Sequence, residues 1–388
     1  MRKRGYWAAV KRDLEHCAQI WIVSSFNVSE PRDLGHLVPT LVVRSIFRGF
    51  SRMLHMSYEP EQKVAIVAIG RNEGDRLKNC LRSAIRDART VVYVDSGSTD
   101  GSPDFARSLN CHVLELNPSR PFSAARARNE GFACLMEHAP DVPFIQFLDG
   151  DCDLVEGWIQ KGMSVFMERA EAGIVCGHVR ELYPQKTIYN KLCDLEWQQF
   201  PGEVRSSGGR FMIRTEIFRA AGGFRADVIA AEDDEFCLRV RRLGWKILLL
   251  DAEMAHHDIA MTRFGEWWRR ATRTGHAFAQ VAALHGGTEE RYFVEDCRRI
   301  WIWALLLPLL AICLAPFTFG LSLLALLCAY ALQFARSFRR GLQRGWQVRE
   351  ASIFSFFTVI FKFPALLGLL EYQRRQWRGQ AFTIIEYK

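Results

Sequence analysis

The longest uncharged stretch of the chain, residues 300–335, limits most strongly how this protein can fold. It is too long for one simple membrane helix, and it is interrupted by Pro308, Pro316 and Gly320. We therefore predict two helices, roughly 301–316 and 319–335. At 1.5 Å per residue, each would cover only about 24–26 Å of a hydrocarbon core about 30 Å thick. The pair would form a thin membrane hairpin or a re-entrant pair.

A third apolar segment, 351–370, is long enough to cross a bilayer and carries Lys362 near its centre. A lysine at that depth costs roughly 2.5–3.5 kcal/mol on insertion scales, so we expect it to be paired or to face a polar path. The segment could span the membrane or lie along its surface. The alternative for all three segments is a buried helical core in a soluble protein, which their lack of an amphipathic period disfavours.

The charge distribution predicts which side of the membrane the chain occupies. Lys and Arg total 51 against 43 Asp and Glu, a formal net charge of +8. The loop before the third apolar segment is rich in arginine, and basic loops favour the cytoplasmic side. Its arginines are Arg336, Arg339, Arg340, Arg344 and Arg349. The eleven cysteines show no C-x-x-C pair, which is typical of reduced thiols in the cytoplasm.

Two other segments have the pattern of helices at a membrane surface. Residues 1–62 include arginines spaced four apart among apolar residues, at Arg44, Arg48 and Arg52. This pattern fits a basic interfacial helix and an ordinary packed helix equally well. Residues 259–299 contain "FGEWWRRATRTGHAFAQ", in which tryptophans suit headgroup depth and arginines suit phosphates.

Residues 63–258 alternate continuous apolar runs with helical patterns, as in "KVAIVAIG" and "TVVYVDSG". This alternation predicts an α/β fold with a mainly parallel sheet covered by helices on both faces. Ligands bind such sheets at the carboxyl ends of the strands. The polar groups that follow the predicted strands are Asn72 and Glu73, Asp95, and Asp149 with Asp151. We expect them to converge at one edge of the sheet.

The run "FIQFLDGDCDL" ends a predicted strand with carboxylates at alternate positions. Two carboxylates spaced i, i+2 on a loop can hold a hard divalent cation and leave positions open for phosphate oxygens. The alternative is a solvated helix cap. The residues alone leave both interpretations open for Asp149, Asp151 and Asp153.

Five segments in order resemble the family 2 glycosyltransferases with the GT-A fold. They are "VAIVAIGRNEGDRLKNCLRSA", "VVYVDSGSTDGS", "SAARARNEGF", "FLDGDCDL" and "AEDDEFCLRVRRLGWKI". The resemblance covers roughly residues 63–258. It implies a UDP- or GDP-linked nucleotide-sugar donor and Mn²⁺ or Mg²⁺ as the metal ion. The usual proline before Asn72 is missing, and a single acid, Asp95, stands where the family often has two.

The resemblance also implies roles for individual residues. Asp149 and Asp151 match the D-x-D motif that binds metal and donor. Asp153 is extra to this motif, and for it the helix-cap interpretation is the better one. Asp95 matches the residue that meets the base or ribose. Asn72 and Glu73 match the family's N-E pair near the same moiety. Arg128, Asn129 and Gly131 match the "ARNxG" helix, where a plain helix with a basic face is the alternative. In "AHHD", His257 is favoured only slightly over His256 as a further metal ligand.

In "AEDDEF", the resemblance makes Asp233 the base that takes the proton from the acceptor hydroxyl. One base and one metal are enough for direct displacement with inversion. The alternative is an acidic first helical turn, which fits Asp234 or Glu235 better. The glycines of "SSGGRFMIR" and "AAGGF" precede this motif and resemble the loop beside the acceptor.

The sequence therefore predicts an inverting, metal-dependent, hexosyltransferase-type enzyme at the inner (cytoplasmic) membrane, with its catalytic domain in the cytoplasm. The expected acceptor is a lipid or lipid-linked glycan, as in polysaccharide or glycolipid assembly, and the chain is not expected to bind nucleic acid. The predicted parts are 1–62, 63–258, 259–299 and 300–388. The alternatives are an inactive sugar-nucleotide-binding scaffold and a membrane nucleotidyltransferase.

Overall fold

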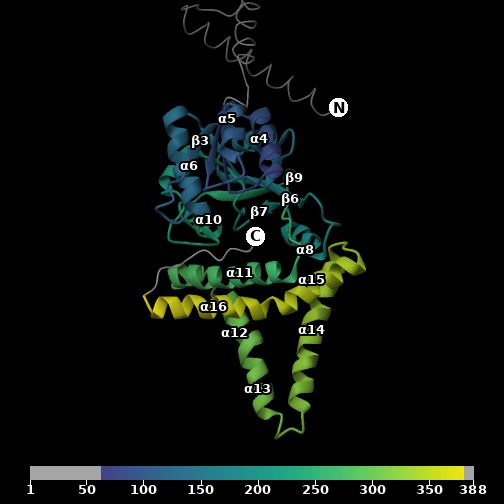
Figure 1. Ribbon diagram of the computed structural model, residues 1–388. Helices are drawn as coiled ribbons and strands as arrows, with labels where there is room; N and C mark the ends of the chain where they lie inside the picture. The colour runs from purple at the N-terminus through teal and green to yellow at the C-terminus, as the bar shows by residue number, and fades with distance from the viewer. Residues whose placement is uncertain (1–62, 380–388) are drawn as a thin grey trace, which may run out of the picture. The chain divides into compact units, whose positions relative to one another are not determined.

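The computed structural model of the protein describes residues 63–379. These residues form an α/β domain on one mixed sheet, followed by long helices (Figure 1). The strands are β1 (Val64–Gly70), β2 (Thr90–Asp95), β3 (His112–Glu115), β4 (Phe144–Asp149), β5 (Cys152–Leu154), β6 (Ala172–Glu181), β7 (Gly202–Glu203), β8 (Phe211–Arg214) and β9 (Lys246–His257). The predicted helix near the N-terminus, around Arg44–Arg52, lies outside the described residues.

The strand order is β3-β2-β1-β4-β8-β6-β9-β5, and β7 pairs with β9. The first four strands in this order are mutually parallel, while β8 runs antiparallel between β4 and β6. Strand β9 runs parallel to β6 and antiparallel to β5 and β7. Strand β1 is apolar throughout, and β2 is apolar between Thr90 and Asp95, as expected for strands whose side chains are buried on both faces. The predicted α/β fold is confirmed.

Helices cover both faces of this sheet (Figure 1). They are α4 (Asp75–Asp87), α5 (Ser102–Ser108), α6 (Ala124–His138), α7 (Trp158–Glu168), α8 (Ile188–Trp197), α9 (Thr215–Ala220) and α10 (Glu232–Arg242). Helix α6 packs on β1 and β2 through Gly131, where a Cβ would overlap Val67 and Val94. The missing side chain thus lets α6 lie close to the sheet, so that Gly131 has a packing role.

Two helices form the predicted hairpin, and both are longer than predicted. The first is continuous over Val294–Leu314 and consists of α12 (Val294–Trp301), a π-helical segment η2 (Ile302–Leu306) and α13 (Leu307–Leu314). The second is α14 (Leu321–Gln343). Pro308 does not break the first helix, because the preceding turns widen to a π-helix that accommodates the missing N–H and the bulk of the ring.

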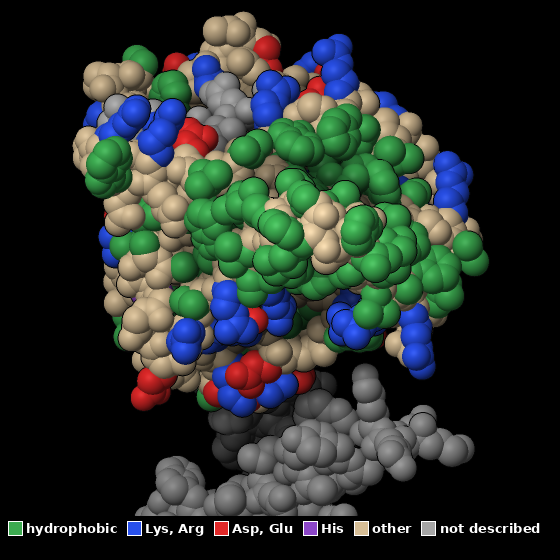
Figure 2. All heavy atoms as spheres, turned by 90° about the horizontal axis from the view of Figure 1, so that it is seen from below, with side chains coloured by type: hydrophobic (Ala, Val, Ile, Leu, Met, Phe, Trp, Pro, Cys, Tyr) green, Lys and Arg blue, Asp and Glu red, His purple; other side chains and the backbone are tan. Residues whose placement is uncertain are grey.

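The hairpin carries its apolar side chains on the outside. No residue in the most apolar window of α14 is buried, and Phe319 at the tip is 99% exposed. Viewed from below, apolar side chains gather into one broad patch with Lys and Arg around its edges (Figure 2). Helices Val294–Leu314, Leu321–Gln343 and Val348–Trp377 are long and apolar enough to cross a membrane. Such exposure contradicts the alternative of a buried helical core.

The third apolar segment divides into α15 (Val348–Ile360) and α16 (Lys362–Trp377), so Lys362 stands at the start of a helix. Helix α16 packs along α11 (Phe264–His285), and the pair lies between the sheet domain and the hairpin (Figure 1). Contact is close because Gly275 faces the Ala365 backbone and Gly368 faces the Thr272 carbonyl. Of the two predicted alternatives, this packing favours a helix along the membrane surface.

Candidate active site

The register of the sheet brings the predicted polar groups to one edge. Gly70 at the end of β1 pairs with Asp95 on β2, and Ile69 pairs with Asp149 on β4. Asn72 and Glu73 follow β1 directly. Three strands that are far apart in sequence therefore end beside one another, and their carboxyl ends form the floor of the candidate site.

Hydrogen bonds join the loops after β1 and β2. The Asn72 N–H donates to the Ser98 hydroxyl at 2.9 Å, and the Asn72 side-chain oxygen accepts from the Thr99 N–H at 2.8 Å. Asn72 has a φ of 53°, in the left-handed region that asparagine tolerates better than most residues. The Gly74 N–H donates to Asp100 at 2.9 Å. Asn72 therefore holds the two loops together.

Asp95 is 1% exposed and accepts three hydrogen bonds within the domain. One oxygen accepts from the Tyr93 hydroxyl at 2.8 Å, and the other from the backbone N–H groups of Gly97 and Ser98 at 2.9 and 2.7 Å. Burial and the neighbouring carboxylate raise the pKa of Tyr93. Asp95 thus shapes the loop after β2, and its predicted contact with a nucleotide stays a prediction.

Arg128 on α6 joins two acidic parts of the site. Its guanidinium is buried and donates to Asp149 at 2.7 Å and to Glu232 at 2.8 Å. Burial lowers the pKa of Arg128, but the nearby carboxylates outweigh it and raise the pKa overall. A Cβ on Gly209 would overlap this guanidinium, which explains a glycine at that position. The second "ARNxG" residue, Asn129, instead pairs with the backbone of Phe224 at 2.7 and 2.8 Å.

Pairing of β5 with β9 places His257 opposite Cys152, next to Asp151. The His257 Nε2 lies 3.0 Å from Asp151 Oδ2, and both side chains are buried. Trp197 packs against the His257 ring with centroids 4.6 Å apart. The ligand atoms of Asp151, Cys152 and His257 lie within 4.8 Å of one another. His256 faces the other way, toward Asp153 and Glu253.

This donor set fits a divalent cation. Carboxylate ligands suit both Mn²⁺ and Mg²⁺, and an imidazole ligand suits the transition metal Mn²⁺ better than Mg²⁺. Burial raises the pKa of the Cys152 thiol well above its usual range, so it stays protonated and is a poor ligand. The Asp149 oxygens turn toward Arg128 at 2.7 Å and Arg210 at 3.7 Å. Asp149 therefore lies at the same edge as this cluster but outside it.

Asp153 does not cap a helix. It lies in β5 and pairs with His256, whereas the next helix, α7, begins at Trp158 after Gly157. Of the three alternate carboxylates, Asp149 thus ends β4, Asp151 lies between the two strands, and Asp153 lies in β5. The helix-cap interpretation of Asp153 was therefore wrong.

Helix α10 begins with four acids, and three of them have partners. Glu232 binds Arg128, Asp234 accepts from Tyr292 at 3.0 Å, and Glu235 binds Arg239 at 2.7 Å. Among residues 63–379, Asp233 forms no ion pair. Burial and the neighbouring acids, Asp234 first, raise the pKa of Asp233 to about 7. A carboxylate with that pKa takes up protons well near neutral pH.

Sequence reasoning missed Arg210, Glu232 and Tyr292 as members of the site. Arg210 contacts Asp149 and Cys152, and it stacks over Trp197 at 5.7 Å. The "SSGGR" loop signalled this arginine, but nothing in the sequence signalled Tyr292, which lies 58 positions from Asp234. Its role depends on how the segment before α12 folds back onto α10.

Comparison with known proteins agrees with this geometry. The model of glycosyl transferase family 2 matches residues 65–228, and the model of glycosyl transferase family 21 matches residues 198–387. Together, these two matches support assignment of the chain to the family 2 glycosyltransferases. It is 19% identical to the mannosyltransferase PcManGT from Pyrobaculum calidifontis, solved with GDP-Man and Mn²⁺, with a TM-score of 0.54 over 84% of this chain and 94% of that one. That likeness establishes the GT-A fold.

Two curated relatives carry glycosyltransferase names. Glycosyltransferase AglE of Haloferax volcanii is 23% identical over 63% of this chain and 81% of its own length. The pre-mycofactocin glycosyltransferase of Mycobacterium tuberculosis is 24% identical over 57% of this chain, and the match spans 48% of that relative. These comparisons support glycosyltransferase activity with a nucleotide-sugar donor.

Proposed function

We propose that this family 2 glycosyltransferase is an inverting, metal-dependent enzyme at the inner membrane face. It would move a hexosyl group from a UDP- or GDP-linked donor to a lipid or lipid-linked glycan. The proposal is carried by the environment of Asp233. This side chain has no ion-pair partner among the described residues, and its pKa is raised to about 7. Its neighbour Glu232 is joined through Arg128 to Asp149, and His257 binds Asp151 two residues further along the chain.

Asp151 and His257 would hold Mn²⁺ or Mg²⁺, and Asp149 would complete the set after releasing Arg128 or Arg210. When bound, the ion would neutralise charge on the leaving diphosphate. The Mn²⁺ in PcManGT supports this assignment. The two arginines beside Asp149 are placed to donate to phosphate oxygens, because a guanidinium matches them with two parallel hydrogen bonds.

Asp233 would accept the proton of the acceptor hydroxyl as that oxygen attacks the anomeric carbon. The sugar–phosphate bond breaks as the new glycosidic bond forms, so the anomeric configuration inverts. The neighbouring acids support this role because their charge raises the pKa of Asp233 and so makes it a stronger base. Glu232 holds Arg128 close to this carboxylate, which limits the rise.

The membrane segments support a lipid acceptor. Arginines lie at the sheet-domain ends of both hairpin helices, at Arg298 and Arg299 on α12 and at Arg339 and Arg340 on α14. Basic residues there favour the cytoplasmic side, which fits a donor made in the cytoplasm. Asp95, Asn72 and Glu73 line the loops nearest the predicted nucleotide, and we propose that they position it.

The decisive experiment is donor turnover by the full chain in detergent with membrane lipid extract as acceptor. Nucleotide release would be followed for a panel of nucleotide sugars with Mn²⁺, Mg²⁺ or chelator. We expect release from one donor, loss of it with chelator, and loss of it in Asp151→Asn and Asp233→Asn. Asp153→Asn is the matched control, because this acid is close by but faces His256. Turnover that survives chelator or Asp233→Asn would refute the mechanism.

A further inference from the structure

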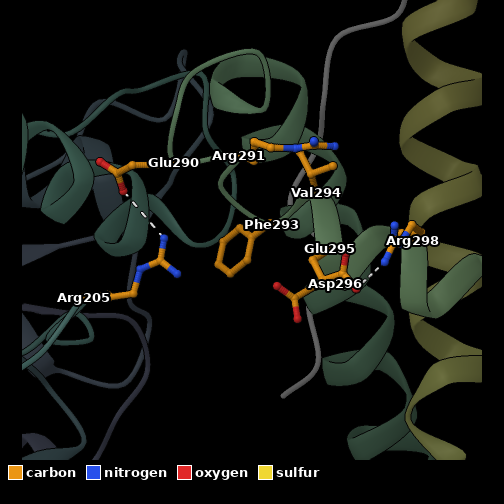
Figure 3. A pocket seen from close by; sticks show the side chains of 8 residues that line it. All are labelled: Arg205, Glu290, Arg291, Phe293, Val294, Glu295, Asp296 and Arg298. Atoms are coloured by element: carbon orange, nitrogen blue, oxygen red, sulfur yellow. Dashed lines mark hydrogen bonds and ion pairs between the residues drawn. The ribbon is translucent and has the colours of Figure 1, made fainter.

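A cavity of about 340 Å³ lies where the sheet domain meets the first hairpin helix. Its wall comes from Arg205 after β7, from the segment before α12, and from the first turns of α12 (Figure 3). The charged lining residues are Arg205, Arg291 and Arg298 with Glu290, Glu295 and Asp296. The volume is at the small end of the usual range for ligand sites, which suits the head of a larger molecule.

This cavity is connected to the catalytic base through one short loop. Arg205 lines the cavity, Gly208 lies beside the Asp233 carboxylate, and Arg210 contacts Asp149. Three residues of extended chain reach at most about 10 Å, so the cavity wall and Asp233 are near neighbours. The Tyr292 hydroxyl reinforces this connection from the other side by donating to Asp234.

The depth of the cavity relative to the membrane is set by α12. Val294 lines the cavity, and the uncharged stretch of the hairpin begins at residue 300. Six residues of helix cover about 9 Å. A headgroup layer adds only about 5–8 Å to each side of the hydrocarbon core. Because Arg298 also lines the cavity and lies only two residues before that stretch, the cavity extends through the headgroup layer to its outer limit.

The charge of the lining favours a neutral ligand. Three arginines and three acids give a balance of zero, whereas a phosphate site needs an excess of positive charge. Glu290 is bound tightly by Arg241 at 2.8 Å and only loosely by Arg205 at 3.7 Å, which leaves Arg205 free to donate elsewhere. The ring of Phe293 stands between the Arg205–Glu290 pair and the Glu295–Arg298 pair (Figure 3).

We infer that this cavity binds a neutral saccharide on the head of a membrane-anchored acceptor. Hydroxyl groups both donate and accept, so they match a wall that alternates guanidinium donors with carboxylate acceptors. The Phe293 ring offers an apolar surface for the C–H face of a sugar. This inference rests on the proposed function, because it assigns the acceptor of that same reaction.

The test uses the full chain with lipid extract as acceptor and two soluble competitors that share one tail. These are octyl glucoside and octyl phosphate, both below the concentration at which they form micelles. The variant is Arg205→Gln with Asp296→Asn, which changes one donor and one acceptor on opposite walls. The control is Arg169→Gln, an exposed arginine paired with Glu171 at the start of β6, away from the site.

We expect octyl glucoside to compete with the extract in the parent and control proteins and to lose this effect in the double variant. The half-saturating amount of extract should rise about tenfold in that variant, with donor KM unchanged, since only acceptor binding is lost. The inference is overturned if octyl phosphate alone competes, or if the double variant behaves as the parent does.

Failure of the proposed function would look different from failure of this inference. If the parent protein releases no nucleotide with any donor and extract, the transferase mechanism fails. Binding of octyl glucoside is then measured directly by saturation-transfer NMR. Binding that is lost in the double variant and kept in Arg169→Gln supports the cavity as a saccharide site, and equal binding by all three proteins overturns it.

Discussion

At the scale of single residues, the acidic start of α10 shows how four similar side chains acquire different tasks. Glu232 neutralises the buried Arg128, Glu235 pairs with the half-buried Arg239, and Asp234 accepts from Tyr292. Asp233 alone keeps its charge unpaired among the described residues, at the cost of a raised pKa. The environment, and not the residue type, thus separates the proposed base from three acids that have bonding partners.

The raised pKa of Asp233 predicts how activity depends on pH. The base must be ionised to accept a proton, so kcat/KM should fall about tenfold per pH unit below about pH 7 and level off above it. Asp233→Asn should lower kcat by about 10²–10⁴-fold and remove the acid limb. Steady-state rates from pH 5 to 9 would check this. An acid limb near pH 4 would contradict the assignment.

The same pKa predicts an effect on stability with a defined sign. Because the folded pKa of Asp233 is raised from 3.8 to about 7, the folded state binds more protons than the unfolded state between these values. Its contribution therefore destabilises the fold as pH rises from 4 to 7 and is constant above that. Asp233→Asn should raise Tm at pH 8 and leave it nearly unchanged at pH 4, as thermal melts would show.

Tyr292→Phe tests the contact between the hairpin segment and the base helix. The hydrogen bond from Tyr292 lowers the pKa of Asp234, so its loss should raise that pKa and leave less negative charge beside Asp233. The pKa of Asp233 should then fall, and the acid limb of kcat/KM should move to lower pH. We also expect a loss of about 1–3 kcal/mol in stability. An unmoved acid limb would show that Tyr292 only packs.

At the scale of elements, α11 joins the membrane-facing helices to the catalytic loop. Gln280 on α11 donates to the Asp227 carbonyl at 2.6 Å and accepts from the Ile229 N–H at 3.3 Å, which fixes the segment just before α10. On its other face α11 packs tightly against α16 through Gly275 and Gly368. We therefore expect a movement of α16 to be transmitted through α11 to the segment before α10, the helix that carries Asp233.

Gly275→Ala and Gly368→Ala should separate these two helices. A methyl group at either position overlaps backbone atoms of the facing helix, which cannot yield as a flexible side chain would. We expect a loss of about 1–3 kcal/mol in stability for each variant, as for other overpacked sites. Gly265→Ala is the control, because nothing lies within 4 Å of its added methyl group. Thermal unfolding in detergent measures all three, and equal melting temperatures would contradict the tight crossing.

Much of the element layout could be predicted from the sequence, because the apolar strand runs and the uncharged stretch are local signals. The convergence of Asn72, Asp95 and Asp149 was also predictable, since parallel strands end at one edge. The contact between Asp151 and His257 depends on how β5 pairs with β9, and no local pattern specifies that register. Pro308 lies inside the predicted helix 301–316, but the sequence could not show that a π-helical segment would accommodate it.

At the scale of the whole molecule, the proposed function requires the hairpin to hold the candidate site at a lipid surface. Its exposed apolar side chains form the broad patch seen from below, and the cavity above it opens at headgroup depth (Figure 2). A donor from the aqueous side and an acceptor from the membrane side would thus meet at the edge of one sheet. This arrangement requires the hairpin to be inside the bilayer while the sheet domain stays in water.

Two native cysteines offer a test of that requirement. Among the described cysteines, Cys313 on α13 and Cys328 on α14 are exposed, while the others are buried or half-buried. A thiol in hydrocarbon is shielded from charged reagents and does not form the reactive thiolate.

In intact membranes, a charged maleimide should leave both cysteines unmodified, whereas detergent-solubilised, denatured protein should be labelled at both. Mass spectrometry of the peptides that contain Cys313 and Cys328 measures the labelling. The uncharged N-ethylmaleimide serves as the comparison reagent. Rapid labelling of both cysteines by the charged reagent in intact membranes would place the hairpin in water and remove the basis for a lipid acceptor.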